Sequence, residues 1–227
     1  MRADDPNLPL LRAVALPLGE LCERLVFVGG AVAGLLVTDP LAEGIRATRD
    51  VDAVIDAGYA AFQQVEAALM DKGFTREMDS GVICRWVHRD SGSLFDLMPV
   101  RPEVLGFSNR WYPFAVESAE PFPLGDGLVI RVASALAFVA TKLEAFSSRG
   151  GGDILGSHDL EDILAVVDGR DTLPREWAGG PPAVRDAVAQ AFRALIAHPD
   201  FLNALPGLIA ESDRAAIVLS RLRDMSR

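Results

Sequence analysis

The spacing of apolar residues changes along this chain, and each change predicts a different secondary structure. Helical spacing in the opening segment gives way to apolar strands separated by turns, and from about Ser134 only helical spacing continues. The first part predicts a helix from about residue 10, strands over 25–28, 50–55, 82–89 and 93–100, a hairpin over 124–132, and helices ending near 37 and covering 59–72. The second part predicts helices over 134–148, 157–167, 183–197 and 213–223.

These elements predict an α/β domain over residues 1–132 and a helical domain over residues 133–227. A hydrophobic fraction of 50% in 227 residues is ample for packed cores. Cys22 and Cys84 stand far apart in apolar surroundings, so we expect buried free thiols and a reducing, cytoplasmic location. No apolar run reaches the length needed to cross a bilayer, so no membrane partner is expected.

The net charge of −10 argues against a general nucleic-acid coat protein, because such affinity comes from neutralising phosphates. The segment from Lys72 to Arg110 is nearly neutral, whereas the rest of the chain is acidic. Two interpretations stay open for it: a local basic face, or ordinary solvated strand faces.

Two carboxylates lie two residues apart in the strand predicted over residues 50–55. Alternate strand residues point to one face, so Asp50 and Asp52 would project side by side. Like charges this close repel unless a cation lies between them, and Mg²⁺ is bound by a few carboxylates plus substrate phosphates. With Asp96 from a later apolar strand, the three acids could share two metal ions, an arrangement suited to phosphoryl or nucleotidyl transfer.

A second interpretation of these acids needs no metal. Each one alone could be a residue at a strand end, paired with an arginine such as Arg49. An arginine filling the space between the acids would argue against an enzyme.

Gly29-Gly30 joins an apolar strand to a short helix. Such a junction lets backbone N–H groups approach phosphate oxygens. The spacing does not fit the dinucleotide-binding fingerprint, and Leu35-Leu36 stands where a P-loop requires Lys-Ser or Lys-Thr.

Lys142 is one of only two lysines in a chain with 22 Lys and Arg residues. A compact ammonium on a flexible stem suits contact with a phosphate, and Arg149 shares its helix face. The alternative is a helix flank where Lys142 pairs with a nearby acid. Further along, Ser157 is a predicted N-cap, and Asp159 and Asp162 lie three apart on one helix face, where acids also favour the helix dipole.

Gly29-Gly30, Asp50-Val51-Asp52 and Asp96 together resemble the catalytic signature of the polymerase-β-like nucleotidyltransferase superfamily. The downstream Lys142, Arg149 and the run from Ser157 to Ile163 resemble the helical motif of its branch that includes the AbiEii-type toxins of type IV toxin–antitoxin systems. The resemblance covers roughly residues 25–170.

This resemblance implies an α+β fold, with a mixed sheet and flanking helices followed by a helical domain that closes a cleft. It also implies transfer of a nucleoside monophosphate from an NTP with two Mg²⁺ ions. Asp50 and Asp52 would be metal ligands, and Asp96 a third acid that also helps to activate the acceptor. The residues implied to contact the nucleotide are Gly29, Gly30, Arg49, Lys142, Arg149 and Asp162, and Asp159 or Asp162 would take the acidic position of the helical domain.

Three functions follow as hypotheses. The first is a nucleotidyltransferase acting on RNA, with tRNA as a candidate, or on a protein hydroxyl, in company with a cognate antitoxin if the toxin resemblance holds. The second is a non-catalytic nucleotide-binding or partner-binding module of the same fold. The third is a transferase that modifies a small cationic molecule such as an aminoglycoside, which an acidic cleft would attract.

Overall fold

The computed structural model describes residues 4–148 and 153–227, which form two compact units. The sheet unit comprises Pro6–Val32 and Ala47–Ser134. The helical unit comprises residues 4–5, Ala33–Arg46, 135–148 and 153–227. The second unit therefore begins two residues later than the sequence predicted, and Ala33–Arg46, placed by the sequence in the first domain, belongs to the helical unit.

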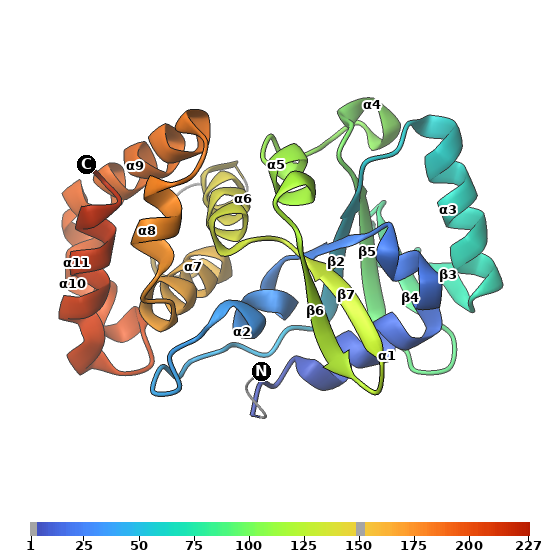
Figure 1. The fold of residues 1–227 in the computed structure, drawn as a ribbon, viewed down its shortest axis with the longest axis horizontal. Helices are drawn as coiled ribbons and strands as arrows, with labels where there is room; N and C mark the ends of the chain where they lie inside the picture. The colour runs from blue at the N-terminus through green and yellow to red at the C-terminus, as the bar shows by residue number, and fades with distance from the viewer. Residues whose placement is uncertain (1–3, 149–152) are drawn as a thin grey trace. The chain divides into compact units, whose positions relative to one another are not determined.

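The sheet unit is built on a seven-stranded mixed β-sheet. Its strands are β1 (Val26–Val28), β2 (Asp50–Ile55), β3 (Phe74–Arg76), β4 (Arg85–His88), β5 (Leu94–Pro99), β6 (Glu120–Gly125) and β7 (Leu128–Val132). They lie in the order β3-β4-β5-β2-β1-β7-β6 (Figure 1). β2 runs parallel to β5 and β1 parallel to β7, whereas the other neighbours are antiparallel. The two apolar strands β1 and β2 therefore lie next to each other inside the sheet.

Short helices flank this sheet. They are α1 (Leu8–Leu18), α3 (Tyr59–Asp71), α4 (Pro102–Leu105) and α5 (Tyr112–Glu117), with 3-10 turns η1 (Gly19–Glu23) and η2 (Gly30–Val32). α1 packs on β2 and β7, α3 on β3, and α5 on β1 and β2. The large aromatic residues of the strands, Phe27, Phe74, Trp86 and Phe95, are fully buried.

The helical unit contains α2 (Ala33–Leu36), α6 (Ala135–Ser148), α7 (His158–Gly169), α8 (Leu173–Ala178), α9 (Pro182–Ala197), α10 (Pro199–Leu208), η3 (Ser212–Arg214) and α11 (Ala215–Asp224). α6 packs against α7, α8 and α9, and α11 packs against α7 and α9. Phe138, Phe192 and Phe201 are fully buried among them. The side chain of Ser157 accepts a hydrogen bond from Leu160 N, so the predicted N-cap of α7 is confirmed.

Arginines of the last two elements hold the C-terminal end of α7. Arg214 Nε donates to both carboxylate oxygens of Asp168, at 2.8 and 2.9 Å, and its Nη2 donates to Asp39 at 2.7 Å. Arg221 donates to Val167 O at 2.8 Å. The backbone N–H groups of Thr38 and Asp39 both donate to Gly169 O. The chain after α2 is thereby attached to the end of α7, which satisfies carbonyl groups that a helix terminus leaves without an intrahelical partner.

The structure is an α+β protein with a mixed sheet and flanking helices, as the sequence predicted. Asp90-Ser91-Gly92 forms the turn between β4 and β5, with Gly92 at positive φ. Sequence reasoning missed β3, α4, α5, α8 and α10. No helix among the described residues is both long enough and apolar enough to span a bilayer.

Candidate functional site

The register between β2 and β5 brings the predicted acids to one face of the sheet. Asp52 is the direct partner of Asp96 in this parallel pair, so their side chains leave the sheet on the same side. Asp50 precedes Asp52 by two residues and shares that side. Asp96 is buried, with 6% of its surface exposed, whereas the Asp50 side chain is 31% exposed. The three acids therefore lie on one face, and Asp96 is the buried one, whereas Asp50 and Asp52 are partly exposed.

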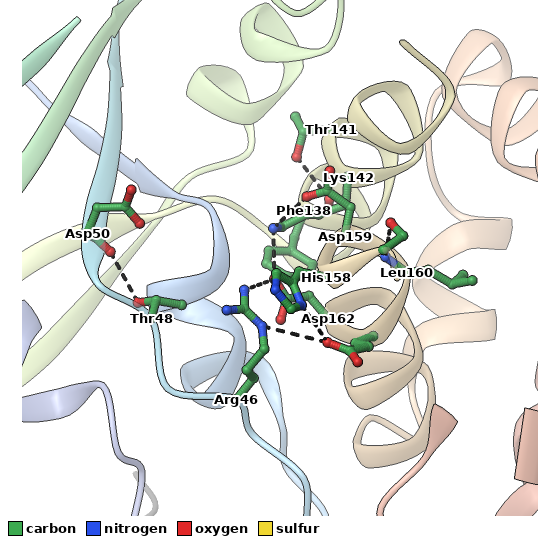
Figure 2. A network of polar contacts seen from close by, with 12 residues as sticks. Arg46, Thr48, Asp50, Phe138, Thr141, Lys142, His158, Asp159, Leu160 and Asp162 are labelled. Atoms are coloured by element: carbon green, nitrogen blue, oxygen red, sulfur yellow. Dashed lines mark hydrogen bonds and ion pairs between the residues drawn. The ribbon is translucent and has the colours of Figure 1, made fainter. Parts of the chain in front are cut away.

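Local hydrogen bonds fix the start of β2. Thr48 Oγ1 donates to the carbonyl of Asp50 at 3.1 Å (Figure 2), and Thr48 N donates to Asn7 Oδ1 at 2.9 Å. These bonds hold the segment that leads into the strand, so Asp50 begins the ladder with its side chain on the face of the other acids.

The predicted glycine turn lies directly beside the acids. Val28 pairs with Asp52 across β1 and β2, and Gly29 follows at φ +72°, a left-handed conformation that favours glycine. A Cβ added to Gly29 would stand 1.9 Å from Oδ2 of Asp52. Gly30 then begins η2. The glycine is therefore required both by the backbone conformation and by the Asp52 carboxylate.

An arginine that the sequence analysis did not single out lies between the acids. Arg85 on β4 is the antiparallel partner of Asp96. Its Nε and Nη2 donate to the two carboxylate oxygens of Asp96, each at 2.8 Å, and Nη2 also donates to Asp50 Oδ2. The Arg85 side chain is only 16% exposed. Arg49, the arginine considered from the sequence as a partner, is exposed.

The charge of the acids raises the pKa values of both residues beside them. Hydrogen bonding to Asp96 raises the pKa of the Arg85 guanidinium, against the opposing effect of its burial. Burial raises the pKa of the Cys84 thiol to about 12, and the charges of Asp96 and Asp52 add to this effect. Arg85 is therefore a permanent cation here, and Cys84 a neutral thiol.

The carboxylates of Asp50, Asp52 and Asp96 are of the type that binds a hard divalent cation, although Arg85 binds two of them, Asp50 and Asp96. Carboxylate oxygens from neighbouring strands are the ligands that Mg²⁺ prefers. In residues 4–148 and 153–227, however, no three or more His, Cys, Asp or Glu side chains are placed so as to hold a metal ion as they stand. A metal at Asp50 and Asp96 would have to share or replace their bonds with Arg85.

The helical unit contains a second group of charges, centred on Lys142 (Figure 2). Lys142 on α6 donates to Asp159 Oδ1 at 2.9 Å and to Asp162 Oδ2 at 2.7 Å, both on α7. Arg46 Nη2 lies 3.4 Å from Asp162 Oδ2. The side chains of Lys142 and Asp162 are 11% and 3% exposed. The structure thus brings Lys142 and the two predicted acids of the helical motif together.

Burial alone would lower the pKa of Lys142, but the charges of Asp162 and Asp159 more than offset it and raise that pKa. Lys142 is therefore held as an ammonium. His158, the first residue of α7, is exposed, and its Nδ1 lies 2.9 Å from Glu161 Oε2. Arg149, the predicted neighbour of Lys142, lies outside the described residues.

The structure argues against a local basic face between Lys72 and Arg110, one of the two interpretations of this segment. At least three of the six Lys and Arg side chains in this segment are paired with acids: Arg76 with Glu66, Arg85 with Asp50 and Asp96, and Arg101 with Asp56. Arg76 also lies 4.4 Å from the ring centroid of Trp86. These charges are partly neutralised within the protein, which favours the interpretation of ordinary strand faces.

No protein-family model matches the chain, and no curated protein matches it in sequence. Among solved structures, the chain is similar to the antibiotic-resistance factor ANT(2'')-Ia, with TM-score 0.51 and 17% identity over 85% of this chain and 96% of that one. Two Helicobacter pylori structures also match: JHP933, with TM-score 0.47, 13% identity and coverage of 100% and 94%, and a candidate nucleotidyltransferase, with TM-score 0.44, 11% identity and coverage of 100% and 96%. The chain therefore has an α+β fold similar to that of ANT(2'')-Ia.

Proposed function

We propose that this protein is a metal-dependent nucleotidyltransferase, which moves a nucleoside monophosphate from an NTP to an acceptor hydroxyl. The observation that carries the proposal is the register of β2 and β5, which pairs Asp52 with Asp96 and puts Asp50 on the same face. Three acids on one face repel each other and require positive charge nearby, which Arg85 supplies at Asp50 and Asp96 and which we propose a metal ion supplies in the active enzyme.

In this proposal Asp50, Asp52 and Asp96 would hold Mg²⁺, with two ions expected. The metal would supply neutralisation of phosphate charge and activation of the attacking hydroxyl. Asp96 is buried whereas the Asp50 side chain is 31% exposed, so the charge of Asp96 is less screened by water, which would suit it to accept the proton of the attacking hydroxyl. Gly29 and Gly30 follow β1 directly beside Asp52, and we propose that the backbone at this turn contacts a phosphate of the NTP.

For the helical unit we propose that Lys142 is a phosphate ligand. Its ammonium has two carboxylate partners, so a phosphate would have to replace one of them. Asp159 is the more exposed partner, at 20% against 3% for Asp162, and is the one we expect to be released. Asp162 would keep Lys142 in place, with Arg46 beside it.

The test is incorporation of label from each α-labelled NTP, with Mg²⁺, into total RNA, total protein or an added aminocyclitol. Asp52→Asn and Asp50→Asn should lose transfer while they still bind NTP without metal. Asp56→Asn is the matched control, because Asp56 follows β2 and forms an exposed ion pair with Arg101. Full activity in both site variants, or equal loss in the control, would contradict the assignment.

A specific observation favours a small cationic acceptor as the second candidate. The chain carries a net charge of −10, and at least half of the cations of its near-neutral segment are paired with acids. The similar fold of an antibiotic-resistance factor agrees with this candidate. Label that moves to an aminocyclitol and to neither RNA nor protein would select it.

Arg85 lies between Asp50 and Asp96, which is the arrangement expected if the acids need no metal, and it therefore favours the non-catalytic candidate. A binding module would bind NTP and transfer no label to any acceptor, and Asp52→Asn would leave that binding unchanged. The labelling experiment therefore separates this candidate from both enzymes.

The toxin assignment rests on Lys142, Asp159 and Asp162, which resemble the helical motif of the AbiEii-type branch. We propose growth arrest on expression as its test, with RNA or protein as the acceptor and a cognate antitoxin as the partner. Arrest that Asp52→Asn relieves would support a toxin. Normal growth with an active enzyme would remove the toxin assignment and leave the transferase.

A further inference from the structure

Arg85 is a strong cation that the structure places on two of the candidate metal ligands, Asp50 and Asp96. Its guanidinium makes a two-pronged contact with Asp96 and a third bond to Asp50. Such bidentate contacts between charged groups are among the stronger hydrogen bonds in proteins. Limited exposure of Arg85 and Asp96, at 16% and 8% of their side chains, reduces screening by water.

These contacts occupy the carboxylate oxygens that a metal would need. Asp96 uses both oxygens on Arg85, and Asp50 uses Oδ2. A divalent cation and a guanidinium compete for the same lone pairs, and each repels the other. Binding of the metal is therefore coupled to movement of Arg85.

We propose that Arg85 is a built-in counter-ion for these acids, which a divalent cation must displace from Asp50 and Asp96 in order to bind. The inference rests on the proposed function, because it takes these acids as the metal ligands. Without metal, Arg85 keeps the acids paired and the sheet stable. With metal, the guanidinium is released at the site, where its planar group suits a nucleotide phosphate.

The coupling has a direction that an ordinary structural ion pair would not share. Removing Arg85 takes away a competitor, so metal affinity should increase while stability without metal decreases. A purely structural arginine would lower stability and leave metal affinity unchanged or weaker. The two measurements together therefore separate the two roles.

The experiment measures Mn²⁺ binding by titration at constant ionic strength for the wild type, Arg85→Gln and Arg85→Lys. Arg85→Gln should bind Mn²⁺ roughly tenfold or more tightly than the wild type, since one hydrogen bond to a charged group corresponds to about that factor. Arg85→Lys keeps the charge without the planar fork and should lie between them. Arg76→Gln is the matched control: Arg76 is on the neighbouring β3, pairs with Glu66, and should leave the affinity unchanged.

Thermal unfolding with and without Mn²⁺ gives a second readout that needs no activity. Without metal, Arg85→Gln should unfold at a lower temperature than the wild type. On addition of Mn²⁺, its unfolding temperature should rise by more than that of the wild type. Adding Asp96→Asn to Arg85→Gln should abolish that gain. If Arg85→Gln does not fold without metal, Arg85→Lys carries the comparison.

The outcomes separate this inference from the proposed function. Equal Mn²⁺ affinity in the wild type, Arg85→Gln and Arg85→Lys would overturn the inference and leave the transferase. Tighter binding in Arg85→Gln with no nucleotide transfer in any variant would support the inference and overturn the transferase. Absence of Mn²⁺ binding in every variant would overturn both.

Discussion

Gly29 lies directly against Asp52, so that a Cβ added at Gly29 would stand 1.9 Å from Oδ2 and 2.9 Å from Cβ of the aspartate. Gly29 has φ +72°, where a residue with a side chain is strained by about 1–2 kcal/mol. The tight strand-to-helix turn and the position of the acid therefore depend on each other.

Gly29→Ala should displace Asp52 as well as strain the backbone. We expect the free energy of unfolding to fall by at least about 2 kcal/mol, and transfer to fall by about a hundredfold, because a shift near 1 Å of a catalytic group has that effect. Gly81→Ala is the control, with φ +73° and nothing within 4 Å of the added Cβ. Equal losses in the two variants, measured by urea unfolding and labelling, would contradict contact with Asp52 as the cause.

Arg214→Ala should destabilise the helical unit strongly. It would leave the carboxylate of Asp168, whose side chain is 6% exposed, without the arginine that bonds both of its oxygens. Breaking such a buried pair costs about 3–5 kcal/mol, which urea unfolding would detect. Arg175→Ala removes an exposed arginine in the same unit and should change stability by less than about 0.5 kcal/mol. Similar effects in the two variants would contradict this account of the α7 terminus.

Lys142 should make the helical unit sensitive to alkali. The raised pKa means that folding favours its charged form, so this contribution to stability is complete below the ordinary pKa of 10.5 and is lost as pH rises through the raised value. Lys142→Met should lower stability at pH 7 and flatten the decline above pH 10.5. Lys72→Met, the other lysine, is the control. An unchanged alkaline slope in Lys142→Met, followed by circular dichroism, would count against the assignment.

Cys84 should resist alkylation in the folded protein. Its pKa is raised to about 12 by burial and by Asp96 and Asp52, so the thiolate is scarce at neutral pH. Because the unfolded thiol ionises near its ordinary 9.0 and the folded one does not, Cys84 also makes stability fall as pH rises from 9. Iodoacetamide labelling read by mass spectrometry should modify Cys84 only after unfolding. Rapid labelling of the folded chain would contradict this burial.

The sequence predicted the elements that carry strong periodicity, and the structure contains them. β2 and β5 are apolar runs in which single acids stand out, so their faces follow from the two-residue repeat. β3 has only three residues and no repeat to detect. α10 is not predicted because His198-Pro199 indicates the end of a helix. Proline also suits the first turn of a helix, where its missing N–H is not needed, and α10 begins at Pro199.

The acids were found from the sequence, but their arginine was not. Arg49 adjoins Asp50 in the sequence, but neighbouring residues in an extended chain point to opposite sides, so it is not placed to pair with that acid. Arg85 is eleven residues from Asp96 and meets it only through the hairpin. Counting back from the Asp90-Ser91-Gly92 turn would pair the two, so the signal was the hairpin register.

The helical unit is built from stretches of the chain that lie before, between and after the two stretches of the sheet unit. The chain passes from one unit to the other after Asp5, Val32, Arg46 and Ser134. A single cut therefore cannot release either unit whole. A fragment that starts at Ala135 would lack Val37, whose methyl groups fill the space over Gly169 in the intact protein. Because the segment Ala33–Arg46 packs on α7, it can reach its native contacts only after α7 has been synthesised.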